Sequence, residues 1–227
     1  MRAVRLSRGL GFGLVVLTSA LLPACAQQGD AGSEEAAAAA EGSAAQTAAA
    51  GAAAMDAPGG PACAWTDSGA ELTGRASPPD SASVRLGDGV AKVCYSAPSA
   101  RGRQIMGGLV PYGQPWRLGA NEATTIHVTV PAEIGTVRVE PGSYSLYAIP
   151  GESEWTIVVN REANRWGIPI NENVRAQDVG SFTVTPTQTD HVERLSIQFE
   201  PAEEGAAQMV IAWETTRLAF PVRPAGG

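Results

Sequence analysis

From residue 61 onward, hydrophobic and polar residues alternate in short runs, and turn-forming residues separate these runs. Residues 124–130 (Thr-Thr-Ile-His-Val-Thr-Val) show the pattern, because side chains two residues apart lie on the same face of a strand. Residues 83–86 and 90–95 flank Gly87-Asp88-Gly89, a combination typical of a β-hairpin. The pattern predicts that this part of the chain consists of β-strands.

Similar runs recur along the rest of the chain, and no helix longer than a turn or two is expected. The expected strands cover residues 83–86, 90–95, 124–130, 136–139, 143–149, 154–160, 181–185, 193–199, 208–213 and 216–222. Short strands at regular spacing are typical of sandwiches and jelly rolls. We therefore expect one all-β domain over residues 63–227, an antiparallel β-sandwich or jelly-roll-like domain of about nine or ten strands with a single core.

The first 24 residues have a different pattern, which predicts a signal peptide. Three arginines within the first eight residues precede an uncharged, mostly apolar run over residues 9–22 that is too short to span a bilayer. Leu22-Pro23-Ala24-Cys25 resembles the lipobox of bacterial lipoproteins, in which the cysteine is acylated. We therefore expect residues 1–24 to be removed and Cys25 to carry the lipid. The alternative is an ordinary signal peptide, with Cys25 incidental.

Residues 25–62 contain mainly Ala, Gly and acidic residues, with no aromatic residue and Thr47 as the one β-branched residue. Such a composition buries too little apolar surface to offset the entropy of ordering, so we expect a disordered tether. The chain has a formal net charge of −7 at pH 7, which argues against nucleic acid as a partner. The expected location is outside the cytoplasm, lipid-anchored to a bacterial membrane in the periplasm or at the cell surface.

Export also suggests a role for the other two cysteines, Cys63 and Cys94. A disulfide between them would join the start of the domain to an early strand and stabilise it by roughly 3–4 kcal/mol. The alternatives are two buried free thiols, or a Cys63 that is exposed at the end of the tether.

Several long motifs resemble the bacterial family known as domain of unknown function 2911. They are residues 95–103, 107–113, 116–124 and 141–150, with 155–160 and Trp166-Gly167 also fitting. The resemblance covers about residues 77–222. It implies an exported protein, often a lipoprotein, with no established activity.

The segment from residue 107 to 124 combines glycine turns with aromatic, basic, amide and acidic side chains and has no periodicity. Arginine pairs well with carboxylate or phosphate, and tryptophan or tyrosine offers a flat apolar face. The candidate ligand-binding residues are Arg101, Arg103, Tyr112, Trp116, Arg117, Asn121, Glu122 and Thr124. Alternatively, Arg117 pairs with Glu122 and Asn121 bonds the loop backbone, so that the segment braces the sandwich.

Motifs for catalysis, metals and cofactors are not found in the sequence. It contains no Gly-x-Ser-x-Gly nucleophile motif and no His-x-His pair. We therefore expect no catalytic residue, no metal and no cofactor. His127 and His191 are expected to be unrelated surface residues, and Trp155, Trp166 and Trp213 to pack in the core.

Together these observations favour an envelope-anchored lipoprotein with a non-catalytic β-sandwich. It would bind a small polar or carbohydrate-like ligand, a peptide or a protein partner, and contact the membrane through its N-terminal lipid. Two alternatives remain: an envelope hydrolase that uses Glu122 with a second carboxylate, and a purely structural or assembly lipoprotein.

Overall fold

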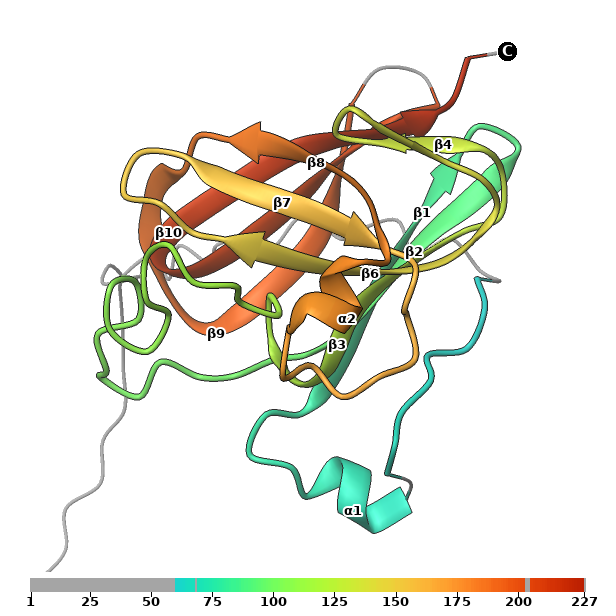
Figure 1. The fold of residues 1–227 in the computed structure, drawn as a ribbon. Coiled ribbons are helices and arrows are strands. Elements are labelled where there is room, and N and C mark those ends of the chain that lie inside the picture. The colour runs from blue at the N-terminus through green and yellow to red at the C-terminus, as the bar shows by residue number, and fades with distance from the viewer. Residues whose placement is uncertain (1–59, 68, 203–204, 227) are drawn as a thin grey trace, which may run out of the picture. The chain divides into compact units, whose positions relative to one another are not determined.

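Two antiparallel sheets pack face to face in the computed structural model, which describes residues 60–67, 69–202 and 205–226 (Figure 1). The larger sheet contains, in order, β1 (Pro79–Leu86), β2 (Gly89–Ser96), β3 (Ala120–Val128), β6 (Gly142–Ile149), β7 (Trp155–Asn160) and β8 (Asp178–Val184). The smaller contains β5 (Val137–Val139), β4 (Ala132–Ile134), β10 (Ala207–Pro224) and β9 (Thr187–Pro201). The prediction of an all-β antiparallel sandwich is therefore confirmed, with ten strands.

Helix contributes little to this part of the chain. The two helices are α1 (Gly69–Thr73), which buries no residue, and α2 (Glu172–Arg175), which buries Val174. The Asn171 side chain caps α2 by accepting a hydrogen bond from the Val174 amide. The predicted signal peptide, Cys25 and nearly all of the predicted tether lie outside the described residues.

The core lies between the two sheets and is apolar. Val93, Ile126, Leu146 and Val159 face it from four neighbouring strands of the larger sheet. Trp155 and Trp213 are almost completely buried, as the sequence predicts. Trp116 stacks on Trp213 with ring centroids 5.8 Å apart and meets Trp155 edge-on at 5.9 Å. Trp116, one of the predicted ligand-binding residues, therefore contributes to core packing.

The outer face of the larger sheet is polar yet buried. Cys94, Thr125, Ser145 and Asn160 form one row across four adjacent strands of this face. Ser145 and Asn160 have no exposed surface. A polar row of this kind is unusual in a sandwich, because outward-facing residues of such sheets ordinarily contact water. Further parts of the chain must therefore cover this face.

Two segments provide this cover. Residues 60–67, which we call the strap, are joined to β2 by a disulfide between Cys63 and Cys94. Residues 161–170, which we call the β7 loop, follow β7 and lead into α2. In α2, the Val174 carbonyl accepts a hydrogen bond from the side-chain amide of Asn160 at 2.6 Å. The strap and the β7 loop leave a gap between them, and this gap positions the candidate site.

The structure also corrects several expectations. The two strands predicted over residues 208–213 and 216–222 are one strand, β10, which passes through two irregularities in its pairing with β9. The short strand β4 lies between two predicted strands and was not expected. His127 is 5 % exposed and is not the surface residue that we expected, whereas the His191 side chain is 54 % exposed.

Candidate functional site

A cleft of about 340 Å³ opens on the outer face of the larger sheet, between the strap and the β7 loop. We call it the Glu122 cleft. Its lining consists of Ala64, Trp65 and Thr66 from the strap, Glu122, Ala123 and Thr125 from β3, and Ala163, Asn164, Arg165 and Trp166 from the β7 loop. Three segments distant in sequence thus meet around one hollow, and two of them contribute a tryptophan.

Backbone hydrogen bonds fix the β7 loop against β3. The Ala123 amide donates to the Arg165 carbonyl at 3.1 Å, and the Gly167 amide donates to the Asn121 carbonyl at 2.8 Å. A Cβ atom at Gly167 would lie only 2.7 Å from the Asn121 carbonyl oxygen and would also collide with the Arg117 side chain, so this close approach favours glycine. These contacts place Arg165 and Trp166 beside the cleft.

A buried ion pair links Glu122 to residues before β1. Arg75 Nη1 lies 2.7 Å from Glu122 Oε2 and Arg75 Nη2 lies 2.8 Å from Oε1, a two-point contact. The Arg75 and Glu122 side chains are 8 % and 7 % exposed. The backbone N–H of Thr66 donates to Glu122 Oε1 at 2.9 Å, and the Thr66 hydroxyl donates to the same oxygen. Asp67 accepts two further hydrogen bonds from Arg75. Glu122 therefore holds the strap in place.

The same contacts determine the charge of Glu122. Burial would raise the pKa of this carboxyl, but the hydrogen bonds from Arg75 and Thr66 outweigh it and lower the pKa to about 2. The pKa of Arg75 is raised, chiefly by its hydrogen bond to Glu122. Both groups are therefore charged at neutral pH.

Arg165 has a different environment. Its Nη1 donates to the carbonyls of Trp166 and Gly167, each at 3.1 Å. Its Nε and Nη2 are buried and have no hydrogen-bond partner among the described residues, and the same is true of Ser145 Oγ. Burial lowers the pKa of Arg165. The cleft thus borders a guanidinium group with two unused donors.

A second polar network lies next to Arg165. The Tyr147 hydroxyl donates to Asp178 Oδ2 at 2.7 Å, and the side-chain amide of Asn160 donates to Asp178 Oδ1 at 2.7 Å. Burial and the neighbouring Asp178 raise the pKa of Tyr147. Each Asp178 oxygen therefore accepts a hydrogen bond from a neutral side chain.

Of the eight ligand-binding residues predicted from the sequence, Glu122 lines the cleft. Arg117 lies directly behind the β7 loop at Gly167, and Asn121 donates its side-chain amide to the Ser77 carbonyl at 3.2 Å. Arg117 does not pair with Glu122, whose partner is Arg75. Thr124 is fully buried and donates to the Leu118 carbonyl at 2.9 Å.

The other predicted residues lie outside the cleft lining. The Arg103 guanidinium donates to the Ser99 carbonyl at 2.7 Å, and the Arg101 amide donates to Glu193 Oε1 at 2.8 Å. Tyr112 is 40 % exposed. The cleft residues that the sequence analysis missed are Trp65, Thr66, Arg165 and Trp166, together with Arg75 behind Glu122.

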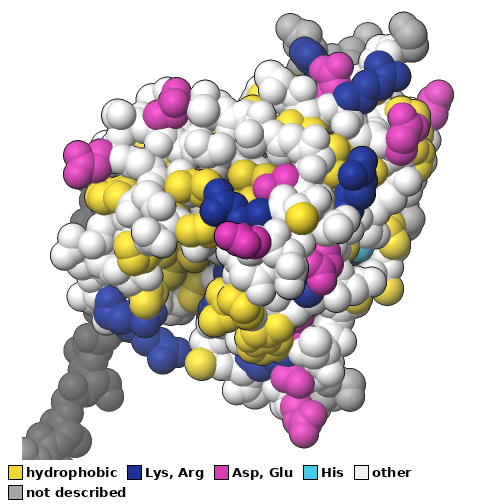
Figure 2. Space-filling model, in the orientation of Figure 1, with side chains coloured by type: hydrophobic (Ala, Val, Ile, Leu, Met, Phe, Trp, Pro, Cys, Tyr) yellow, Lys and Arg dark blue, Asp and Glu magenta, His cyan; other side chains and the backbone are white. Residues whose placement is uncertain are grey.

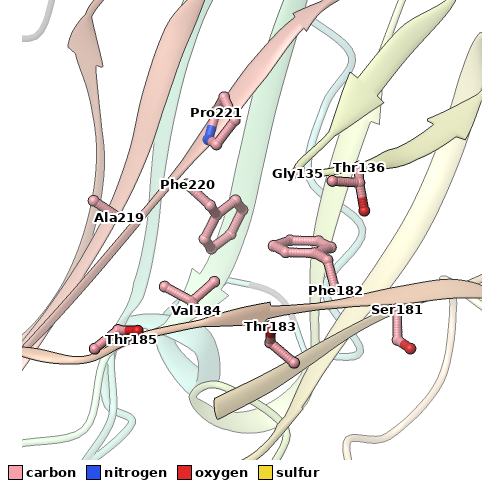
Figure 3. Close-up of a pocket in the computed structure, with 10 residues that line it drawn as sticks. All are labelled: Gly135, Thr136, Ser181, Phe182, Thr183, Val184, Thr185, Ala219, Phe220 and Pro221. Atoms are coloured by element: carbon pink, nitrogen blue, oxygen red, sulfur yellow. The ribbon is translucent and has the colours of Figure 1, made fainter. Parts of the chain in front are cut away.

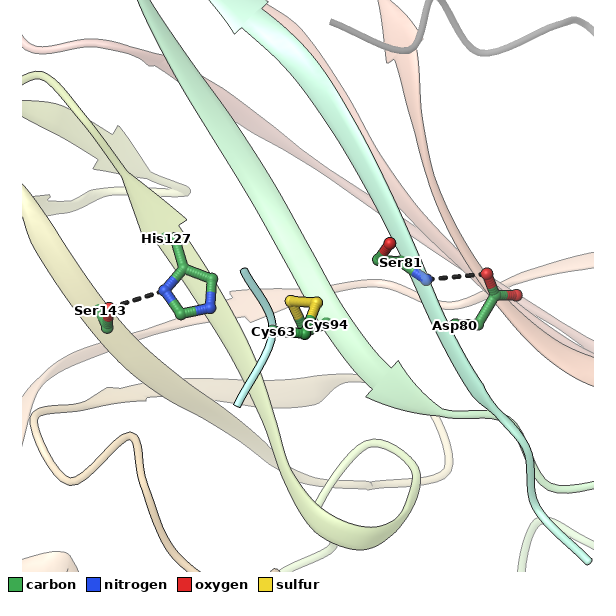
Figure 4. Close-up of a disulfide and its surroundings, with 6 residues drawn as sticks. All are labelled: Cys63, Asp80, Ser81, Cys94, His127 and Ser143. Atoms are coloured by element: carbon green, nitrogen blue, oxygen red, sulfur yellow. Dashed lines mark hydrogen bonds between the residues drawn. A yellow bond between two sulfur atoms is a disulfide. The ribbon is translucent and has the colours of Figure 1, made fainter. Parts of the chain in front are cut away.

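Figure 4 shows the disulfide that joins the strap to β2, with His127 on the neighbouring strand β3. His127 Nδ1 lies 2.6 Å from Ser143 Oγ, and its buried Nε2 has no partner in the described part of the chain. Burial, and then the nearby Lys92, lower the pKa of His127. His127 is therefore neutral at neutral pH.

A larger hollow of about 630 Å³ lies between β8 and β10 (Figure 3). The rings of Phe182 and Phe220 meet edge-on there with centroids 5.1 Å apart, and every lining residue is uncharged. Phe182 and Phe220 are 8 % and 2 % exposed, so they belong to the core. The lining of the Glu122 cleft, in contrast, includes charged, polar and aromatic side chains.

Within the described residues, no group of three or more His, Cys, Asp or Glu side chains is arranged to hold a metal ion. No helix in this part of the chain has the length and apolar character needed to cross a bilayer.

A family model described as "Protein of unknown function (DUF2911)" matches residues 77–222, more than half of the 227-residue chain. The chain belongs to this family. The match confirms the resemblance that the sequence motifs indicate. No curated protein and no solved structure gives a significant match.

The DUF2911 region contains only part of the candidate site. It includes the cleft residues of β3 and of the β7 loop, whereas Trp65, Thr66 and Arg75 precede it. The strap that completes the Glu122 cleft is therefore an N-terminal addition to the matched region.

Proposed function

We propose that this protein is an envelope-anchored lipoprotein whose β-sandwich binds a small polar, carbohydrate-like ligand in the Glu122 cleft without transforming it. The observation that carries the proposal is the lining of the cleft. Trp65 and Trp166 contribute flat apolar rings, while Thr66, Asn164 and Arg165 contribute polar groups. Ligand sites combine apolar and aromatic walls with a few placed polar groups in this way.

The exposure of Trp166 supports this proposal. Its side chain is 47 % exposed, although Trp155 and Trp213 are almost completely buried. The backbone on both sides of Trp166 is bonded to β3, so the ring is presented from a fixed position. A fixed and exposed indole costs little entropy when a ligand stacks on it.

The state of Glu122 favours binding over hydrolysis. Glu122 is the one acidic residue in the cleft lining, and its lowered pKa leaves it without a proton to donate at neutral pH. A glycoside hydrolase needs two carboxyl groups, one of them protonated. Because Arg75 and Thr66 already occupy both oxygens, we assign Glu122 to positioning the strap.

Anchoring at the envelope is supported by the signal-like residues 1–24, by Cys25 and by the disulfide, since disulfides persist mainly outside the cytoplasm. On the face that Figure 2 shows, acidic and basic side chains are interspersed with hydrophobic ones between them. A surface of mixed charge suits a small polar ligand better than a polyanion.

A titration followed by tryptophan fluorescence tests the proposal. The purified protein is titrated with glucose, N-acetylglucosamine, glucuronic acid and N-acetylmuramic acid. We expect a saturable change with at least one of them, and Trp166→Ala should weaken that binding about tenfold or more because the ring is one wall of the cleft.

Tyr112→Ala is the matched control, because Tyr112 is also exposed but lies outside the cleft lining. It should bind as the wild type does. The proposal fails if no sugar gives a saturable change, or if Tyr112→Ala abolishes binding while Trp166→Ala does not.

A further inference from the structure

The unused edge of Arg165 points to the class of ligand. Nε and Nη2 carry parallel N–H groups along one edge of the planar guanidinium, and neither nitrogen has a partner among the described residues. This is the edge that binds a carboxylate at two points. The other side is occupied, because Nη1 already bonds two backbone carbonyls.

Carboxylates near this guanidinium do not form an ion pair with it. Glu122 is paired with Arg75. Glu162 and Asp178 interact with the charge of Arg165 at longer range, and this raises the pKa of Arg165 less than burial lowers it. In the described part of the chain, neither Arg165 nor Arg117 behind the same loop forms an ion pair within 4 Å. A half-buried positive charge with unpaired donors is costly, and an anion from outside would remove that cost.

We propose that the ligand of the Glu122 cleft is an acidic saccharide, whose carboxylate binds the Nε–Nη2 edge of Arg165 while its ring packs on Trp166. This inference rests on the proposed function and adds the ligand class to it. Arg165 and Trp166 both line the cleft, and the two nitrogens of this edge have no hydrogen-bond partner among the described residues.

The surroundings favour a carboxylate over a phosphate. One planar edge with two donors matches one planar carboxylate. A phosphate dianion would bring twice the charge into a cleft that the ionised Glu122 also lines. A uronic acid and a sugar bearing a lactyl ether both present the required group next to a pyranose ring.

The test compares acids with neutral counterparts of similar shape by isothermal titration calorimetry. The pairs are glucuronic acid with glucuronamide and N-acetylmuramic acid with N-acetylglucosamine. For the wild type, we expect at least one acid to bind about ten times or more tightly than its neutral counterpart. The ratio of the Kd of the neutral sugar to the Kd of its acid should therefore be about ten or more in the wild type. In Arg165→Gln this ratio should fall to about one.

Two further variants separate charge from geometry. Arg165→Lys keeps the charge but lacks the parallel donors, so its ratio should lie between those of the wild type and Arg165→Gln. Arg161→Gln is the matched control, because Arg161 is an exposed residue of the same loop outside the cleft lining. It should leave the ratio unchanged.

If the neutral sugars bind as tightly as the acids, or if Arg165→Gln leaves the ratio unchanged, this inference is overturned while the proposed function stands. If none of the four compounds binds but glucose does, this inference alone is overturned; if glucose does not bind either, both are overturned. Should Arg165→Gln fail to fold, Arg165→Lys decides, since a ratio equal to that of the wild type would contradict the two-point contact.

Discussion

Glu122 and Arg75 lie 47 residues apart in the chain, yet their side chains form a two-point ion pair that is almost excluded from water. Removing one partner of such a pair leaves the other charge buried and uncompensated, which typically costs about 3–5 kcal/mol. At the residue scale, therefore, the stability of the strap depends on Glu122 more than on any surface charge.

We predict that Glu122→Gln lowers the free energy of unfolding at pH 7 by about 3 kcal/mol, measured by chemical denaturation. Glu200→Gln is the control, because Glu200 pairs with Arg217 at the surface and its side chain is 50 % exposed. An exposed pair contributes about 0–1 kcal/mol. Equal effects of the two substitutions would contradict a structural role for the buried pair.

The same pair makes stability depend on pH in a specific window. The pKa of Glu122 falls from an ordinary value of 4.5 to about 2 on folding, so the unfolded chain binds more protons between these values. The contribution of Glu122 is present above pH 4.5 and is lost as the pH falls toward 2. Glu122→Gln should lack this part of the acid transition, and an unchanged profile between pH 4.5 and 2 would contradict the assignment.

At the scale of elements, the strands could be predicted because alternation directly reflects a sheet with one face on a core. The predicted pair over residues 208–213 and 216–222 shows a limit of this rule, since irregular pairing between Ala212 and Thr216 interrupts the alternation inside one strand. The three-residue strand β4 is too short to show a pattern. Alternation therefore fixes the fold class and leaves strand boundaries open.

The candidate site was harder to predict, for a physical reason. Its residues come from the strap, from β3 and from the β7 loop, and only the folded sheet brings them together. Glu122 could be predicted because it lies in a dense polar segment. Trp166 was expected in the core, since an exposed indole in an irregular loop has no periodicity. The position of Trp65 two residues after Cys63 was the one available signal, because a disulfide holds its neighbours against the sheet.

The disulfide gives the strap a testable role. We predict that replacing Cys63 and Cys94 together by serine lowers the free energy of unfolding by roughly 3–4 kcal/mol, because the bond closes a loop between residues 31 apart. Trp65 and Thr66 would lose their fixed position, so sugar binding should weaken as well. Thermal denaturation and the fluorescence titration measure the two effects. Unchanged binding in a folded double variant would show that the strap is not part of the site.

At the scale of the whole molecule, the sequence combines a lipobox-like motif at residues 22–25 with a β-sandwich that belongs to the DUF2911 family. Acyl chains on a single cysteine provide the anchor in the proposed arrangement, since each buried methylene contributes about 0.8 kcal/mol. The ligand cleft is built entirely from residues after this anchor. Anchoring and binding should therefore be separable by substitution.

We predict that Cys25→Ser moves the protein from the membrane fraction to the soluble fraction and leaves sugar binding intact, as measured by fractionation and titration. The control is Cys63→Ser, which removes a cysteine after the anchor and should remain with the membrane. Retention of Cys25→Ser on the membrane would contradict the lipoprotein assignment.

The central claim, that the Glu122 cleft is the ligand site, is tested most directly by the indole N–H signals of the five tryptophans in an NMR titration with glucuronic acid and N-acetylmuramic acid. Trp65 and Trp166 line the cleft, whereas Trp116, Trp155 and Trp213 pack together in the core. We predict that the signals of Trp65 and Trp166 shift in a saturable way while the other three stay in place. Binding that leaves the Trp65 and Trp166 signals unmoved, or no binding at all, would contradict the claim.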